Sequence, residues 1–348
     1  MPTLKDIAES LDLSVMAISK ALRDAPDISA GTKVKVIKEA ERLGYVPNHS
    51  AQQLRGAKSG LVGIIVPHIN DPLSANFIQG IQEQATDYGY DVIVQSSREN
   101  TANEVKVFKR LLTRRVEAIF LYPHHQIQHR SPIYEESKKQ SLPVIFLESY
   151  PSDLNQSDSV LRVLIDNQRA GILAVEHLRS LGHKRILFFS GPPAAKAAAD
   201  FYHGYTSTMM KHGIRNWNEY VFLAGHGFEG GRDAMVRALS EKLQFSAVIC
   251  ATDSIAVGAC DQLIRSGISV PEEVSVVGFG DGMIAQNGKV GLTTIRRPQV
   301  DLGRAAVQLW KNQGKVGLKS RSTDSQEKIM NVDLMIREST APIRKSAT

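Results

Sequence analysis

The sequence predicts a small all-α head followed by a large α/β core. Residues 1–46 hold three short stretches of helical periodicity and no strand pattern. From Leu61 onward, apolar runs of strand length alternate with helix patterns, and the alternation starts again after Val160. Apolar runs joined by helices are typical of parallel strands that are buried on both faces. We therefore predict two doubly wound parallel-sheet lobes with a cleft between them.

The head has the pattern of a helix-turn-helix. Thr3 can cap a first helix over residues 4–11, and Ser14 can cap a second helix over residues 15–23. Only a short turn separates the two, and this is the geometry in which the second helix enters the major groove of DNA.

A third helix is predicted after Ser29, with a cationic outer side that could equally be an ordinary solvated surface. Its helical spacing predicts an inward-facing apolar side formed by Val34, Ile37, Ala40 and Leu43.

The segment between head and core has the pattern of a joint. Gly44 can end the third helix in the left-handed conformation, and Pro47 disfavours a helical residue before it. Asn48 or Ser50 can cap a short new helix, which Gly56 would end. From these residues alone the segment is either a plain linker or a functional hinge. The predicted organisation is a head at 1–46, a hinge helix or linker at 47–59, a core at 60–340 with an N-lobe (about 60–160 and 292–322) and a C-lobe (about 161–291 and 323–340), and a tail at 341–348.

The core pattern predicts individual strands and helices. We expect strands at Leu61–Val66, Val92–Gln95, Ala118–Tyr122, Val144–Leu147, Val160–Ile165, Ile186–Ser190, Val221–Ala224, Ala247–Ala251 and Val274–Gly278. We expect helices at 73–89, 102–115, 168–181, 203–213, 230–242, 254–266 and 300–312. The polar residues 151–159 suit a crossing between the lobes, and residues 314–328 suit a surface loop.

Composition limits the class of protein. The chain has 348 residues, 42% of them hydrophobic, which is enough for a sizeable core. A net charge of +6 is compatible with a polyanionic partner. The two cysteines, Cys250 and Cys260, form no CxxC pair, so a disulfide framework is excluded. Without a signal pattern or an apolar run of roughly 18 residues, we expect a soluble cytoplasmic protein.

Motifs of enzymes and metal proteins are absent from the sequence. It contains no Walker A loop, no HExxH and no GxSxG, and Gly278–Gly282 does not have the GxGxxG spacing. His124, His125 and His129 lie in a polar stretch without cysteines or clustered acids, where exposed histidines are commoner than ligands. We therefore expect no catalytic residue, no metal and no cofactor.

Four carboxylates lie at or just after predicted strand ends, where open α/β sheets bind ligands. Each could accept hydrogen bonds from a ligand or cap the helix that follows, and the residues alone leave both roles open. These residues are Glu148, Asp166, Asp253 and Asp281.

The whole chain resembles the LacI/GalR family of bacterial transcription regulators. The resemblance follows the family's order from end to end. The matching stretches are Leu4–Ala8, Met16–Leu22, Leu43–Asn48, Gly63–Pro67, His177–His183, Asp253–Gly258, Leu292–Ile295 and Ile336–Thr340. The core is also similar to periplasmic sugar-binding proteins, which carry signal peptides and have no such head.

The resemblance implies a homodimer, in some members a tetramer, that binds a pseudo-palindromic operator. Val15 and Met16 match the positions that most often choose the bases, and Leu54 matches a leucine that wedges into the minor groove. Lys20 departs from the arginine usual in the family. The DNA-binding positions implied are Thr3, Ser14, Val15, Met16, Ser19, Lys20, Ser29, Thr32, Tyr45, Asn48, Ala51 and Leu54. This favours the functional hinge.

In the core, the resemblance implies an effector in the cleft, a sugar or a sugar-like metabolite. Many sugar-binding members have Arg where Phe201 stands, and Asp where Gly280 stands, so the cleft differs from theirs in what it can hold. Phe228 and Trp217 could offer aromatic faces but are equally plausible core residues. The expected effector-binding residues are Leu73, Ser74, Phe77, Glu148, Phe201, Phe228, Asp253, Asp281 and Arg297.

These expectations combine into an effector-controlled DNA-binding repressor of carbohydrate metabolism. A small molecule in the cleft would shift the population between two lobe angles and so change the spacing of the hinges. Two alternatives belong to other classes. A ligand-binding module without DNA function would not need the head, and an enzyme would need catalytic groups that the sequence does not show.

Overall fold

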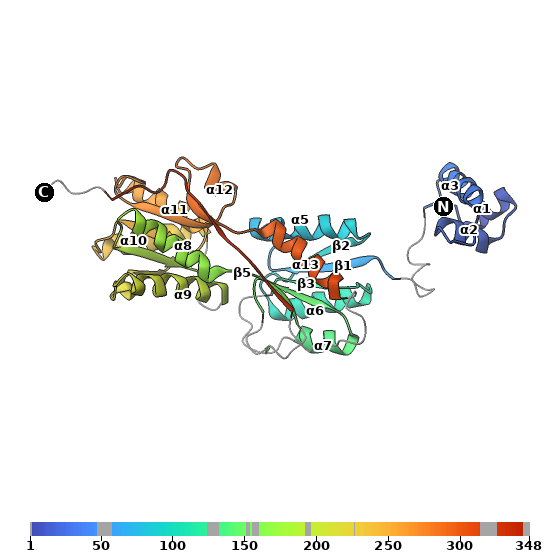
Figure 1. Cartoon of the computed structure of the whole chain (residues 1–348), viewed down its shortest axis with the longest axis horizontal. Helices are drawn as coiled ribbons and strands as arrows, with labels where there is room; N and C mark the ends of the chain where they lie inside the picture. The colour runs from blue at the N-terminus through green and yellow to red at the C-terminus, as the bar shows by residue number, and fades with distance from the viewer. Residues whose placement is uncertain are drawn as a thin grey trace. The chain divides into compact units, whose positions relative to one another are not determined.

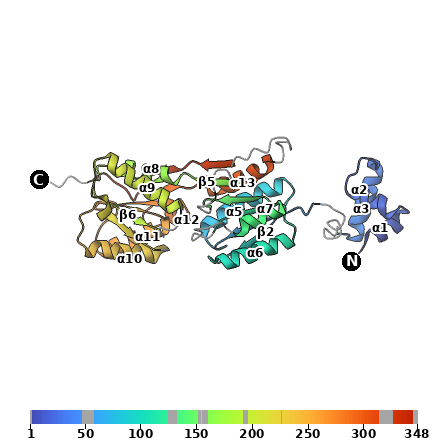
Figure 2. The ribbon, with the colours of Figure 1, turned by 90° about the horizontal axis from the view of Figure 1, so that it is seen from below.

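The computed structural model describes residues 2–46, 58–123, 132–150, 154, 160–191, 196–225, 227–313 and 326–343. The chain divides into two compact units, Met1–Ser59 and Gly60–Thr348, which we call the head and the core. Figure 1 and Figure 2 show the head as a group of helices and the core as two lobes that each contain a sheet. No helix in the described ranges is long and apolar enough to cross a membrane.

The head contains the three helices that the sequence predicts, α1 (Leu4–Leu11), α2 (Val15–Leu22) and α3 (Ala30–Leu43). The predicted caps are present, since Ser14 Oγ accepts from the Ala17 amide at 3.1 Å. Gly44 ends α3 with φ 66°, in the left-handed region that glycine takes without strain.

One face of α3 differs from the expectation. Val36 and Ala40 are buried against Ile7 and Ile18 of the other two helices. Val34 and Ile37, predicted to face inward, are 53% and 46% exposed. Ala40 and Leu43 fit either of two neighbouring apolar stripes, so helical spacing did not decide which stripe packs inward.

The first sheet of the core has six strands in the order β11-β5-β4-β3-β1-β2. All of its pairings are parallel. Its strands are β1 (Leu61–Val66), β2 (Asp91–Ser96), β3 (Ile119–Leu121), β4 (Val144–Leu147), β5 (Leu161–Ile165) and β11 (Gln326–Met330). Its helices are α5 (Pro72–Asp87), α6 (Thr101–Thr113), α7 (Pro132–Gln140) and α13 (Gln299–Gln313).

The second sheet has the order β12-β10-β9-β8-β6-β7, and only β12 runs antiparallel to its neighbour. Its strands are β6 (Ile186–Ser190), β7 (Val221–Leu223), β8 (Ala247–Cys250), β9 (Ser275–Gly280), β10 (Thr293–Arg296) and β12 (Asp333–Met335). Its helices are α8 (Asn167–Ser180), α9 (Lys196–Lys211), η1 (Trp217–Tyr220), α10 (Gly227–Ser240), α11 (Asp253–Arg265) and α12 (Met283–Gln286).

Sheet membership shifts the predicted lobe boundaries. β5 pairs with β4 and therefore belongs to the first sheet, so residues 151–159, most of which lie outside the described residues, do not cross between the sheets. β10 belongs to the second sheet although 292–322 was assigned to the N-lobe, and β11 belongs to the first although 323–340 was assigned to the C-lobe. The chain thus passes between the sheets after β5, after β10 and between β11 and β12. Because the chain crosses between the sheets three times, residues at the carboxyl-terminal edges of both sheets can contribute to one binding site.

Candidate functional site

The first turn of helix α2 carries two exposed apolar side chains. Ile18 and Ala21 are buried in the head, which turns Val15 and Met16 outward with 40% and 70% of their surface exposed. Exposed apolar side chains on the second helix of such a motif can contact thymine methyl groups in the major groove. Ser19 is half-buried on the same helix.

Lys20 forms an ion pair with Asp27, and this hydrogen bond holds the pKa of the Asp27 carboxyl below its usual value. A phosphate that recruited Lys20 would have to compete with this exposed carboxylate, which is a small cost for a surface pair.

Three of the other predicted DNA-binding residues of the head lie at helix starts. Thr3, Ser14 and Ser29 cap α1, α2 and α3, where free backbone N–H groups favour phosphate oxygens. Thr32 and Tyr45 are half-buried. Asn48, Ala51 and Leu54 lie outside the described residues, as do the three loop histidines.

A cavity of about 520 Å³ lies at the carboxyl ends of both sheets in the core. Pro67 follows β1, Tyr122 follows β3 and Ala251 follows β8, so three different strands deliver its walls. Open α/β sheets bind ligands at this edge. We call this cavity the cleft.

Four of the predicted effector residues line the cleft: Leu73, Glu148, Phe201 and Arg297. Two others support lining residues instead. Ser74 donates to Asp71 at 3.1 Å, and Phe77 packs edge-on against Tyr122 with ring centroids 5.6 Å apart.

The remaining three predicted effector residues are not among the cleft-lining residues. Phe228 lies on α10, where its carbonyl oxygen abuts Gly258 of α11. Asp253 and Asp281 belong to a separate polar network, described below. Effector contact by these three residues stays a prediction.

Charged groups from the two sheets meet in the cleft. Arg297, just after β10, forms a buried ion pair with Glu148, just after β4. Gln299 donates to the second Glu148 oxygen at 2.6 Å, and the Arg297 guanidinium lies 4.7 Å from the Phe279 ring centroid. The ring centroids of Phe279 and Phe201 lie 4.8 Å apart. Burial is the larger cause and the negative charge of Glu148 the smaller cause of a raised pKa at the Tyr122 hydroxyl.

Sequence reasoning missed several members of this group. Tyr122, Phe279 and Gln299 were not assigned to the site, and neither was Thr252. Tyr122 ends one predicted strand and Thr252 directly follows another, which is the same signal that selected Glu148. Nothing in the local pattern of Gln299 marks it, because its partner Glu148 is far away in the chain.

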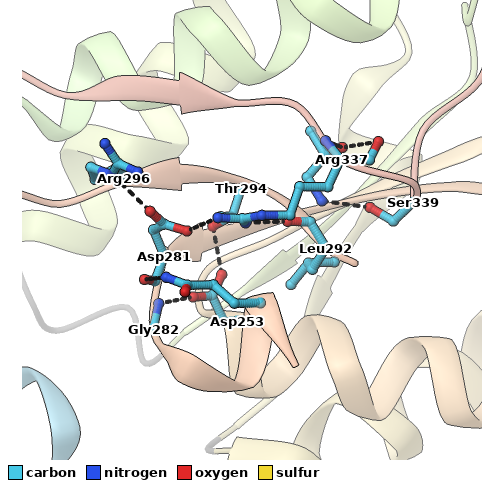
Figure 3. Close-up of polar contacts among 10 residues, drawn as sticks. Asp253, Asp281, Gly282, Leu292, Thr294, Arg296, Arg337 and Ser339 are labelled. Atoms are coloured by element: carbon cyan, nitrogen blue, oxygen red, sulfur yellow. Dashed lines mark hydrogen bonds and ion pairs between the residues drawn. The ribbon is translucent and has the colours of Figure 1, made fainter. Parts of the chain in front are cut away.

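Asp253 and Asp281 are engaged inside the second lobe (Figure 3). Asp253 accepts from the Thr294 hydroxyl at 2.6 Å and from the Gly282 amide at 3.0 Å. Asp281 lies between two arginines, accepting from Arg296 Nε at 2.7 Å and from Arg337. The network therefore joins α11, the loop after β9, β10 and the C-terminal segment.

Gly280 explains one departure from the family pattern. Its φ is 145°, and a Cβ atom placed on it would lie 2.8 Å from Asp253 Oδ2. A Cβ on Gly278 would lie 2.4 Å from Asp253 Oδ1. The Asp253 carboxylate thus packs on bare backbone, and an aspartate at position 280 would displace it.

Comparison with known proteins decides the family. A family model described as "Periplasmic binding proteins and sugar binding domain of LacI family" matches residues 59–331, and "Bacterial regulatory proteins, lacI family" matches residues 3–48. The chain belongs to the LacI family. It is a DNA-binding transcription regulator with an effector domain of the sugar-binding type, and the family consists of regulators, not enzymes.

Relatives of this LacI-family regulator match it over nearly its whole length. The HTH-type transcriptional repressor CytR of Escherichia coli (strain K12) is 29% identical over 97% of this chain and 96% of the relative. Catabolite control protein A of Priestia megaterium is 28% identical over 88% and 91%. The lac repressor dimer bound to operator and the anti-inducer ONPF has a TM-score of 0.84 at 24% identity, covering 98% and 99% of the two chains, and shows the shared fold.

Asp253 gives the stability of the core a testable pH dependence. Burial raises its pKa above the ordinary value of 3.8. The folded state then holds this proton more tightly than the unfolded state, so stability present at low pH is lost as the pH rises through the raised pKa. Relative to Asp253→Asn, the wild-type protein should lose stability as the pH rises above the ordinary aspartate pKa of 3.8. Urea unfolding of both proteins over a pH series from acidic to neutral measures the difference, and a relative gain by the wild type would contradict the raised pKa.

Proposed function

We propose that the chain acts in the cytoplasm as a homodimeric repressor that binds a pseudo-palindromic operator. An effector that binds in the cleft raises or lowers the affinity of the repressor for this operator. The observation that carries the proposal is the cleft itself. Its walls come from the carboxyl ends of both sheets, and Glu148 and Arg297 join them across it. A ligand that changes this junction has a direct way to favour one lobe arrangement over another.

Relatives support both the operator-binding part and the effector-binding part of the proposal. CytR and the regulator GalR of Escherichia coli (strain K12) carry names of a repressor and a regulator. A LacI-family regulator from Enterococcus faecium with bound ribose covers 82% of this chain at 25% identity, with a TM-score of 0.69. A small hydroxylated compound such as ribose is therefore the kind of effector with which we compare this cleft.

The proposed mechanism is a population shift. The three crossings are the covalent connections between the two sheets, and the cleft is lined by residues of both sheets. An effector that binds one lobe arrangement better than the other changes the population by its difference in affinity. The head then follows through residues 47–59, the predicted hinge.

Base reading by Val15 and Met16 tests the DNA-binding half. Because both side chains are exposed on α2, exchanging them (Val15→Met with Met16→Val) should change the preferred half-site. Selection from a random DNA library with the full chain measures this. Lys20→Ala is the matched control, which should weaken all sites similarly and reduce the salt slope by about one. Recovery of the same operator by the exchanged variant would refute base reading by this pair.

A further inference from the structure

The described lining residues of the cleft include one arginine, Arg297, and one terminal nitrogen of its guanidinium is already engaged. Arg297 donates to Glu148, and the Arg297 and Glu148 side chains are only 6% and 2% exposed. Gln299 donates a hydrogen bond to the other Glu148 oxygen at 2.6 Å. A guanidinium fork is the usual protein group for a phosphate or carboxylate, and here its paired nitrogen faces an internal carboxylate.

The other charges of the cleft are unfavourable to an anion. Asp71 lines it while capping α5, and Glu99 lines it while pairing with His68 at 3.5 Å. With Glu148, the lining residues hold three carboxylates against one guanidinium and one imidazole. A ligand phosphate would thus enter a site whose described lining residues carry a negative balance of charge and include no uncommitted cation.

The walls favour a flat ring. Phe201 and Phe279 line the cleft from the second lobe with their ring centroids 4.8 Å apart, and Tyr122 lines it from the first lobe. Flat rings gain from such surfaces through offset or edge contacts.

One buried donor of the lining residues has no partner among the described residues. Arg297 Nε is buried and makes no hydrogen bond within the described residues. A buried donor without a partner is costly, and a ligand acceptor such as a carbonyl or ring oxygen would satisfy it.

We infer that the effector is an uncharged, hydroxylated compound with a flat ring, and that the Glu148–Arg297 pair makes the cleft reject anions. The inference rests on the proposed function, since it takes the cleft as the effector site. A nucleoside and an aryl glycoside share this chemistry, so the test contains both.

Calorimetry with the full chain compares matched pairs of probes. The pairs are uridine with uridine 5′-monophosphate and phenyl β-glucoside with phenyl β-glucuronide, and glucose serves as the probe without a flat ring. At least one uncharged flat-ring probe should bind, with its anionic counterpart and glucose weaker by about 10-fold or more. Equal or tighter binding of the anions, or no binding of either uncharged flat-ring probe, would overturn the inference.

Glu148→Gln tests the role of the pair separately. The variant keeps a hydrogen-bond acceptor but frees the Arg297 charge, so the ratio of anion to neutral affinity should rise by about 10-fold or more. A merely structural role would weaken both probes alike and leave the ratio unchanged, which would overturn the assignment. Glu229→Gln, at an exposed ion pair on α10, is the matched control and should not change the ratio.

Operator binding separates this inference from the proposed function. An anionic compound that bound the cleft and released operator would overturn the inference and leave the proposed function in place. An uncharged flat-ring compound that bound the cleft with the expected selectivity, yet did not change operator affinity, would support the inference and contradict the proposed function.

Discussion

Replacing Arg297 with leucine should lower the free energy of unfolding of the core by about 3–5 kcal/mol. The variant leaves the Glu148 carboxylate buried with Gln299 as its remaining donor. Taking a charge out of water is expensive, and only the guanidinium in this pair offsets that cost. Because a whole domain is stabilised by only about 5–15 kcal/mol, the core should approach unfolding at ambient temperature. Urea titration followed by circular dichroism measures the loss.

The double variant Glu148→Leu with Arg297→Leu is the control. It removes both charges and fills the space with apolar side chains, so it should recover most of the lost stability. A double variant as unstable as Arg297→Leu alone would show that packing around Arg297, including its contact with Phe279, dominates. A loss below about 1 kcal/mol in the single variant would mean that the pair is effectively solvated.

Asp281→Asn should destabilise the core by about 1.5–3 kcal/mol. The Arg337 contact carries most of this effect, because the Asp281 side chain is 4% exposed and that of Arg337 19%. Arg296 contributes little, since its side chain is 47% exposed and solvent screens the pair. Asparagine tolerates the left-handed φ of 62°, so backbone strain does not add to the loss.

Asp301→Asn is the matched control for this second substitution. Asp301 pairs with Arg304 on the surface of α13, where its side chain is 62% exposed, and the change should cost less than about 1 kcal/mol. Thermal or urea unfolding of the three proteins under one condition makes the comparison. Equal losses in the two variants would contradict a special role for the Asp281 network.

Much of the fold could be predicted because the relevant signals are local. Helix caps such as Ser14 and Ser29 act within three residues, and apolar runs such as Leu61–Val66 mark buried parallel strands. The strands β10, β11 and β12 were missed. β10 (TTIR) contains a single large apolar residue, β11 (QEKIM) begins with three polar residues, and β12 is three residues long, so none gives a continuous apolar run. Sheet membership is set by pairing between distant segments, which no local pattern records.

The site could be predicted only in outline. Position after a strand correctly brought Glu148 to the cleft, and the same position brought Asp253 and Asp281 to the second sheet. Position does not determine which way a side chain turns. Asp253 turns onto Gly282 and Thr294, and Asp281 turns toward Arg337. Those partners lie far along the chain, so the carboxylates alone did not reveal that they were already engaged.

In the proposed mechanism, the cleft and the head are energetically coupled. The most direct test is the operator Kd of the full chain, measured with and without a saturating amount of the uncharged flat-ring probe that binds the cleft most tightly. Allosteric coupling of about 1–3 kcal/mol predicts a change in Kd of roughly 5- to 150-fold. The probe should also lose affinity in Phe201→Ala, which removes a wall of the cleft. Saturation of the cleft with no change in operator Kd would contradict this coupling.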